Sequence, residues 1–444
     1  MNPTYSALPP ASRRGFVKTS AVAGGALATA MHFPHVANAA AAGDKIKIGW
    51  VGCGGRGTGA ANQALNADSN LVMWSMGDIF QDKIDSGLES LKKVQAKTPE
   101  KVSVSPERQF TGLDAFQKVL NSGVDVVLLT TSPGFRPQHI RAAVEAGKHV
   151  FAEKPMAVDG PGVRSVMESI KLAKQKNLAL VDGFVWRWTN ANREVYDKIH
   201  NGALGDIMAV YSSYYTGAVD RYPKWNRTNT KTDLEWQIRR WYYFTWLSGD
   251  HIVEQAVHSI DKLLWTMKDE PPESVICTGG RQVRPGDEGG EYGNIYDHFS
   301  AEYKWASGVK GYHFTRQFDR CHGEVTDRVF GTKGTYEGES GSRRHVFRTG
   351  DTAWRWKGEQ RDGYQTEHDE MYASIRAGKP INTGDRFIKT TLAAIMARMA
   401  AYTGKEITWE MALNSKEDLF PKNIQWDMKL PVAPVARPGS TPFS

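Results

Sequence analysis

Apolar residues between positions 46 and 152 fall into four short runs separated by longer amphipathic stretches. The runs are IKIGWV at 46–51, NLVMWSMGD at 70–78, VDVVLLTTS at 124–132 and KHVFAEKP at 148–155. The stretches at 58–65, 114–123 and 138–147 repeat their apolar positions with helical spacing. Strands that alternate with helices form a parallel, doubly wound sheet. The pattern therefore predicts an α/β domain over residues 45–160.

The pattern changes after residue 160. A helical stretch at 163–177 and a strand at 178–188 precede four strands without long helices between them, at 207–217, 272–280, 297–305 and 308–318. Two amphipathic helices follow, at 364–381 and 386–404. We expect residues 161–430 to form a second domain, and the Pro-rich residues 431–444 to form an extended tail that can reach a neighbouring subunit.

The segment SGDHIVEQAVHSID at 248–261 spaces His251, Glu254, His258 and Asp261 by three, four and three residues. On one helix these side chains share a face. Taken alone, this stripe is compatible with a metal site, a catalytic acid/base site or a solvated helix face. The metal interpretation is disfavoured, because the order differs from HExxH and nothing else in the chain nominates further ligands.

A full G-x-G-x-x-G motif follows the first predicted strand and precedes a helix, as dinucleotide binding requires. Gly52 permits the tight turn, Gly54 lets a pyrophosphate approach the backbone, and Gly57 lets the helix pack on the strand. We therefore expect a cofactor cradle at Gly52, Gly54, Gly55, Arg56 and Gly57. The second strand ends in Asp78, where an acid binds the adenine ribose. Asp78 favours NAD over NADP, although Arg56 and Lys83 soften that preference.

The N-terminus has the features of an export signal. Residues 1–39 contain the pair Arg13 and Arg14, then a weakly apolar run and the tripeptide ANA at 37–39. This resembles a twin-arginine (Tat) signal peptide cleaved after Ala39. Tat export carries folded proteins, so we expect a periplasmic or otherwise exported protein that takes a tightly bound cofactor with it.

Charge and composition narrow the partners. The net charge of +7 falls to +4 without residues 1–39, because 53 basic residues then face 49 acidic ones. No long Lys/Arg block remains, so nucleic acid is not an expected partner. The three cysteines are far apart and indicate neither a disulfide framework nor a CxxC metal site. No stretch beyond the signal approaches the length of a membrane helix.

The string GKHVFAEKPMAVD at 147–159, with the glycine motif, resembles the glucose–fructose oxidoreductase/inositol dehydrogenase/MocA (Gfo/Idh/MocA) family. The resemblance implies a Rossmann domain followed by a larger α/β domain on an open, mostly antiparallel sheet. It also implies NAD(P)-dependent chemistry on a sugar or cyclitol, with Lys154 of the Glu153–Lys154–Pro155 motif beside nicotinamide and substrate. A second family signature falls on 248–261, and it makes His258 the catalytic acid/base and puts Glu254 in an aspartate position.

The chain also departs from the family pattern. Asp250 and His251 replace glycine and a small residue, which adds polar groups that we expect near the substrate. Arg136 takes a position usually held by histidine, after a strand end whose Thr130, Thr131 and Ser132 we expect at the cofactor. The string GFVWRW at 183–188 resembles a family strand, and makes Arg187 a candidate substrate or cofactor contact.

A long aromatic connection at 218–246 contains Trp236, Arg239, Arg240 and Trp241. So many aromatics argue against disorder. Two roles are equally supported: stacking on a sugar, or contact between subunits. We also expect a homo-oligomer, a dimer or tetramer, formed through the C-terminal sheet.

Three functions remain distinct. The first is an exported NAD(P)-dependent oxidoreductase acting on a sugar, glycoside or cyclitol. In it a neutral His258 takes the hydroxyl proton, Lys154 stabilises the developing alkoxide, and Glu254 orients the imidazole or accepts a substrate hydroxyl. The second is an NAD-dependent glycoside hydrolase that uses transient oxidation and elimination. The third is a cofactor-bound binding protein without catalysis.

Overall fold

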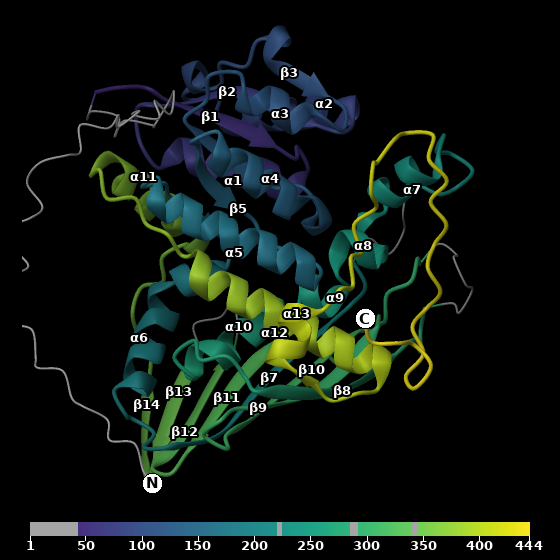
Figure 1. The fold of residues 1–444 in the computed structure, drawn as a ribbon. Coiled ribbons are helices and arrows are strands. Elements are labelled where there is room, and N and C mark those ends of the chain that lie inside the picture. Colours follow the sequence, from purple (N-terminus) through teal and green to yellow (C-terminus); the bar gives the residue numbers. More distant parts are fainter. Residues whose placement is uncertain (1–42, 220–223, 285–291, 340–343) are drawn as a thin grey trace, which may run out of the picture. The chain divides into compact units, whose positions relative to one another are not determined.

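The computed structural model describes residues 43–219, 224–284, 292–339 and 344–444 (Figure 1). The predicted signal peptide at 1–39 lies outside the described residues. Helices in the described part are α1 Gly55–Asn66, α2 Gln81–Val94, α3 Ala115–Leu120, α4 Arg136–Glu145, α5 Gly160–Gln175, α6 Asn190–His200, α7 Asp233–Arg239, α8 Thr245–Ser248, α9 His251–Glu254, α10 Val257–Thr266, α11 Gly363–Arg376, α12 Gly384–Thr403 and α13 Trp409–Asn414.

The first sheet is parallel and confirms the predicted Rossmann domain. Its strands are β1 Ile46–Val51, β2 Leu71–Asp78, β3 Gln109–Thr111, β4 Val126–Leu129, β5 His149–Ala152 and β6 Leu180–Asp182. They lie in the order β3-β2-β1-β4-β5-β6. Chain order reverses between β1 and β4, and the carboxyl ends beside such a reversal are where nucleotides bind in open α/β sheets. The nearly continuous apolar character of β1, β4 and β5 fits strands covered on both faces.

The second sheet is open and mostly antiparallel, as the resemblance implied. Its strands are β7 Ile207–Thr216, β8 Ser274–Gly280, β9 His298–Lys304, β10 Lys310–Gln317, β11 Thr326–Gly331, β12 Gly334–Glu339, β13 His345–Thr349, β14 Thr352–Arg355 and β15 Ile407–Thr408. The order is β14-β13-β12-β11-β7-β10-β9-β8-β15, with β7 and β10 parallel. In β9 and β10, buried residues alternate with more exposed ones, so one face of the sheet is covered.

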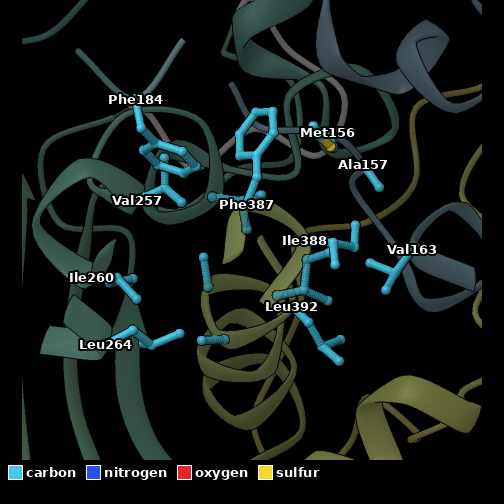
Figure 2. Packing of buried hydrophobic residues seen from close by; sticks show 14 of the residues in the cluster. Met156, Ala157, Val163, Phe184, Val257, Ile260, Leu264, Phe387, Ile388 and Leu392 are labelled. Atoms are coloured by element: carbon cyan, nitrogen blue, oxygen red, sulfur yellow. The ribbon is translucent and has the colours of Figure 1, made fainter. Parts of the chain in front are cut away.

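Helix α12 is buried on nearly all sides and packs against β8 of the second sheet, α5 and α10. Five of its residues are alanine, and alanine favours helix and permits close approach from every direction. Figure 2 shows Phe387, Ile388 and Leu392 of α12 among Val257 and Ile260 of α10. A continuous hydrophobic core therefore runs under α10, the helix that carries His258.

The first domain extends beyond residue 160, the limit that the sequence predicted. Residue 160 begins α5, and β6 extends the first sheet to Asp182. The core around β1 also contains Met371 and Tyr372 of α11, far later in the chain. The run at 178–188 was expected to be one strand, but it ends at Asp182 and continues as a 3₁₀ turn over Val185–Trp188.

The C-terminal tail is extended and packs on its own chain. Tyr296 donates a hydrogen bond of 2.7 Å to the carbonyl of Ala436, and Gly439 donates one of 2.9 Å to Thr403. The backbone amide of Lys416 donates to the carbonyl of Ser444 at 3.1 Å. These contacts account for the tail within one subunit.

Candidate active site

The glycine motif forms an open backbone cradle at the carboxyl end of β1. Gly52 has a φ of 96°, and a Cβ there would lie 2.6 Å from the backbone of Thr130. A Cβ on Gly57 would lie 2.1 Å from the carbonyl oxygen of Gly52. A Cβ on Gly54 or Gly55 would meet nothing within 4 Å, so their backbone faces open space at the start of α1. The cradle thus leaves room for a diphosphate at a helix N-terminus.

Asp78 lies at one end of this cradle, where the sequence placed it. Its carboxylate accepts hydrogen bonds from the backbone amides of Cys53 at 2.7 Å and Phe80 at 3.0 Å. Burial raises its pKa, and the two amides and Lys83 act in the opposite direction. Asp78 and Lys83 line a cavity of about 250 Å³ together with Arg239, and a ribose with its two hydroxyls can use the carboxylate there.

A second cavity, of about 430 Å³, continues from the same glycine loop. It is lined by Gly54, Gly55, Arg56, Gly57, Thr130, Thr131, Ser132, Pro133, Arg136, Glu153, Lys154, Gly183, Tyr214, Val219, Trp241, Tyr242, Glu254, Gln255, His258 and Tyr364. Gly54, Gly55, Thr130, Thr131, Ser132 and Trp241 also line the first cavity. The two cavities therefore share the cradle, and the larger one holds the predicted catalytic side chains.

Lys154 and Glu254 form an ion pair inside the larger cavity. The Lys154 Nζ lies 2.8 Å from Glu254 Oε1 and also donates to the backbone carbonyl of Glu254. Their side chains are 13% and 14% exposed, so both remain accessible from the cavity while water screens them little. The expected contact between Glu254 and the imidazole of His258 is not formed. Glu254 instead fixes the ammonium group of Lys154.

His258 lies on α10 with its imidazole at the cavity wall. Burial lowers the pKa of His258 well below its ordinary range, and the cations Lys154 and Lys262 lower it further. Among the described residues, Nδ1 has no hydrogen-bond partner. An imidazolium would need an acceptor for each of its two N–H groups. Burial and the unpartnered Nδ1 both favour the neutral form of the ring, which is the form that can accept a proton.

The segment at 248–261 is not the single helix that the spacing predicted. Residues His251–Glu254 form α9, and α10 begins only at Val257. His251 turns toward the carbonyl of Tyr296 at 3.2 Å. Because the helix is interrupted, the four polar side chains do not lie on one continuous helix face, and His251 and Asp261 have partners outside the cavity. No group of three or more His, Cys, Asp or Glu residues suited to a metal occurs in the described ranges.

Asp250 has a structural position instead of facing the substrate cavity. It is fully buried, with a φ of 78° and a ψ of 162°, a conformation that glycine adopts far more readily than aspartate. Its carboxylate accepts from the amide of His251 at 2.6 Å, the amide of Tyr296 at 2.7 Å and the hydroxyl of Tyr402 at 2.5 Å. These bonds hold the start of α9. The expectation that Asp250 and His251 contact substrate does not fit this arrangement.

Arg187 also lies away from the cavity. It forms a buried ion pair with Asp261 at 2.7 Å and a second with Asp269 at 2.5 Å. The preceding residue, Trp186, contacts His258 instead, with ring centroids 5.0 Å apart. Adjacent residues of the 3₁₀ turn point in different directions. Trp186 therefore reaches His258, whereas Arg187, one residue later, does not reach the cavity.

Arg136 and Arg56 lie at the wall of the larger cavity, beside the glycine cradle. Arg136 is buried and donates to the carbonyls of Pro155 and Thr131, so it joins the ends of two Rossmann strands. Arg56 lies 2.9 Å from the carboxylate of Glu153. The expected cofactor residues Thr130, Thr131, Ser132, Arg56, Glu153 and Arg136 thus all lie at the cavity wall.

The aromatic connection splits into buried and cavity-lining residues. Trp236 and Arg240 are each only 1% exposed and line neither cavity. Trp241 lines both cavities. Arg239 reaches the first domain, where it pairs with Asp82 at 3.0 Å. The connection therefore covers the cradle, and it contributes Val219, Trp241 and Tyr242 to the wall of the larger cavity.

Sequence reasoning missed several cavity residues. Tyr214 comes from β7, Gln255 from the break between α9 and α10, and Tyr364 from α11. Tyr242 accepts a hydrogen bond of 2.7 Å from Gln317 and lies within the aromatic connection already identified. Tyr242 and Gln255 lie in segments that the sequence had already identified, whereas Tyr214 and Tyr364 reach the site from elements whose arrangement the local pattern does not specify.

Comparison with known proteins identifies the family of the chain. A model of the Gfo/Idh/MocA oxidoreductase family, NAD-binding Rossmann fold, matches residues 46–184, and one of the Gfo/Idh/MocA C-terminal domain matches 192–337. An inositol 2-dehydrogenase from Gluconacetobacter diazotrophicus is 25% identical over 242 residues, which are 54% of this chain and 65% of that protein. The chain spans less than two thirds of the length of the first curated relatives it matches.

Solved structures share the fold. An aldose–aldose oxidoreductase from Caulobacter crescentus, complexed with glycerol, has a TM-score of 0.64 at 18% identity, covering 82% of this chain and 99% of that one. A scyllo-inositol dehydrogenase from Lactobacillus casei with bound NAD(H) and scyllo-inositol has a TM-score of 0.62 at 18% identity, covering 83% and 100%. At these identities the likeness establishes the fold. The expected NAD-binding domain is confirmed by the family model.

Proposed function

The chain belongs to the Gfo/Idh/MocA oxidoreductase family, and from that premise we propose that it is an NAD-dependent dehydrogenase acting on a hydroxyl-bearing carbon of a sugar or cyclitol. One observation carries the proposal: the ammonium of Lys154 and the neutral imidazole of His258 line one cavity, which opens from the glycine cradle. A proton acceptor and a cation beside a dinucleotide site are the groups that alcohol oxidation needs.

The cofactor would lie along the two cavities. The open backbone at Gly54 and Gly55 suits its diphosphate, and Asp78 suits the hydroxyls of its adenine ribose. When bound, NAD accepts the hydride that leaves the substrate carbon. Trp241 and Tyr242 would close the site from the second domain.

The protein's own residues manage the proton and the charge. His258 accepts the proton of the reacting hydroxyl, because its buried ring is neutral at physiological pH. Lys154 stabilises the negative charge that develops on that oxygen. Glu254 holds the Lys154 ammonium at 2.8 Å and so limits where it can lie. In the reverse direction the same groups polarise a carbonyl and return the proton.

The substrate class follows from the cavity wall and from the relatives. Tyr214, Trp241, Tyr242 and Tyr364 offer aromatic surface and hydroxyl groups, which suit the C–H faces and hydroxyls of a polyol ring. The relatives named above include dehydrogenases of inositols and an oxidoreductase of aldoses. A volume of about 430 Å³ has room for one ring beside the nicotinamide.

Purified protein should release NAD on denaturation, identifiable by mass spectrometry, and should change its nicotinamide absorbance with one member of a panel of inositols and aldoses. His258→Asn and Lys154→Ala should each lower kcat by roughly 10²–10⁴-fold, the usual scale for a positioned acid or base. His258→Asn should leave NAD binding unchanged. His322→Asn is the matched control, because His322 is 75% exposed and lies outside the cavity. Near-normal turnover by His258→Asn would refute the proposed chemistry.

The same assay separates the alternatives. A glycoside hydrolase using transient oxidation would cleave an aryl glycoside without net formation of NADH. A binding protein without catalysis would hold NAD and a sugar but turn over none of the panel.

We further propose that the protein is exported by the twin-arginine route with NAD already bound. The support is the Arg13–Arg14 pair in the sequence and the coverage of the cradle by the second domain. In the described part of the chain, no helix combines the length and apolar character that crossing a membrane requires.

We also propose a homo-oligomer formed through the second sheet. By strand register, Ile276 on β8 and Phe330 on β11 lie on the face opposite Val275 and Val329, and they are 50% and 42% exposed. Exposed apolar side chains on a sheet face suit contact with a second copy. Light scattering should give a dimer or tetramer, and Ile276→Lys with Phe330→Lys should give monomers. An unchanged mass for the double variant would exclude this face.

A further inference from the structure

A buried ion pair lies one helical turn away from His258, the proposed proton acceptor. Lys262 follows His258 by one helical turn on α10 and is 1% exposed. Its Nζ lies 2.5 Å from Oδ2 of Asp327 on β11, which is 2% exposed. Apolar residues of similar volume often serve stability as well as a buried pair does. The proposed chemistry does not use this pair, so its position asks for another explanation.

Trp186 connects the buried ammonium with the imidazole. The Nζ of Lys262 lies 4.3 Å from the centre of the Trp186 ring, within the range of a cation–π contact. The same ring lies 5.0 Å from the His258 ring, at an interplanar angle of 47°. On a helix, residues four apart are neighbours on one face. Lys262 and His258 therefore share one indole and lie on the same side of α10.

Other charged and titratable groups around His258 come from every neighbouring element. They are Lys154 after β5, Glu254 at the end of α9, Tyr214 on β7, and, around the same cavity, Arg56, Glu153, Arg136, Tyr242 and Tyr364. Lys154, which is paired with Glu254 at 2.8 Å, acts on the ring from the cavity side. Lys262 approaches from the interior side, where little water screens its charge.

We propose that Lys262 is a positioning residue for His258: through their shared contact with Trp186, its buried charge keeps the imidazole unprotonated and ready to accept the substrate proton. The inference rests on the proposed role of His258 as proton acceptor. A positive charge on the imidazole of His258 would be repelled by the fixed ammonium of Lys262, because water screens charges poorly in this interior. Asp327 supplies the counter-charge that makes burial of Lys262 possible.

The test replaces the pair with neutral partners in two ways. Lys262→Met with Asp327→Leu removes both charges with apolar groups, and Lys262→Gln with Asp327→Asn keeps a neutral hydrogen-bonded pair. Lys262→Arg is the matched control that keeps the charge. The imidazole of His258 is titrated directly by NMR, with its signal assigned from its absence in His258→Asn. The pH dependence of kcat/KM is measured in parallel.

Both neutral pairs should raise the proton affinity of His258 by about tenfold, which is a shift of one pH unit. The acid limb of kcat/KM should move toward neutral pH by the same amount, while Lys262→Arg stays like the wild type. A folded neutral variant with an unchanged His258 titration would overturn the inference. A lower melting temperature without that shift would make the pair merely structural. The titration needs no turnover, so it remains decisive even if no sugar or cyclitol is oxidised.

Discussion

Replacing Asp250 distinguishes a structural carboxylate from a substrate contact. The amides of His251 and Tyr296 and the hydroxyl of Tyr402 are three buried donors that point at this side chain, and Nδ1 of His251 also lies 3.2 Å from its Oδ1. Asp250→Ala leaves all three without their acceptor in the interior. Each such loss costs about 1–3 kcal/mol, so the free energy of unfolding should fall by roughly 3–9 kcal/mol.

Three further variants divide this cost. Tyr402→Phe removes one donor together with its need for a partner, and should cost about 1 kcal/mol. Asp250→Asn keeps one acceptor but turns an N–H group toward a backbone donor, and should cost roughly 2–3 kcal/mol. Asp250→Gly loses the same bonds as Asp250→Ala but relieves backbone strain of about 1–3 kcal/mol at the φ of 78°. The expected order of stability is therefore Tyr402→Phe, Asp250→Asn, Asp250→Gly, Asp250→Ala.

Urea unfolding followed by tryptophan fluorescence measures these differences, and KM is determined for each variant that folds. We expect the losses to appear in stability, with KM nearly unchanged for Tyr402→Phe. A stable Asp250→Asn variant with a strongly raised KM would show that the carboxylate binds substrate after all. Equal stability of the Gly and Ala variants would show that the backbone at Asp250 is not strained.

Burial lowers the pKa of His368 to about 3, so the unfolded chain binds a proton there that the folded chain does not, and stability must fall as pH drops below about 6.5. Between pH 7 and 5, urea titrations of wild type should lose roughly 2 kcal/mol more than those of His368→Phe, and equal losses would contradict this. Asp78→Ser should weaken NAD and relatively favour NADP in equilibrium binding, whereas tighter NADP binding by the wild type would show that the ribose assignment is wrong. Arg13→Lys with Arg14→Lys should keep the protein in the cytoplasm on cell fractionation, and unchanged export in cells without the Tat machinery would refute the signal.

The sequence was most informative where chemistry depends on neighbours in the chain. The glycine motif, Asp78 and Lys154 each lie at the end of a buried strand, and in a parallel sheet those ends meet at one edge. The spacing of apolar residues and the lengths of the strands were therefore enough to place the cofactor cradle. His258 was found by resemblance of a short string, and its neutral state only became visible from burial and from the lack of a partner for Nδ1.

Side-chain direction was what the sequence could not supply. Spacing in 248–261 fits one helix, but Asp250 adopts a positive φ and the helix breaks before Val257, so His251 and His258 face different surroundings. Because Arg187 is charged, the sequence favoured it over Trp186 as a site residue. In the structure, however, Arg187 pairs with Asp261 and Asp269 inside the protein. The order of nine strands in the second sheet depends on long-range pairings, which local patterns do not encode.

Helix α11, which comes late in the chain, completes the hydrophobic core of the nucleotide-binding domain. Met371, Tyr372 and Ile375 of this helix belong to the core around β1, and Arg376 pairs with Asp68 at 2.9 Å. A ribosome that has finished β6 has therefore made the whole first sheet but not the helix that completes its core. Until residue 376 emerges, part of that core faces water or a chaperone. A chain truncated before α11 should thus be recognised as unfinished by the cell's quality control even though its glycine motif is intact.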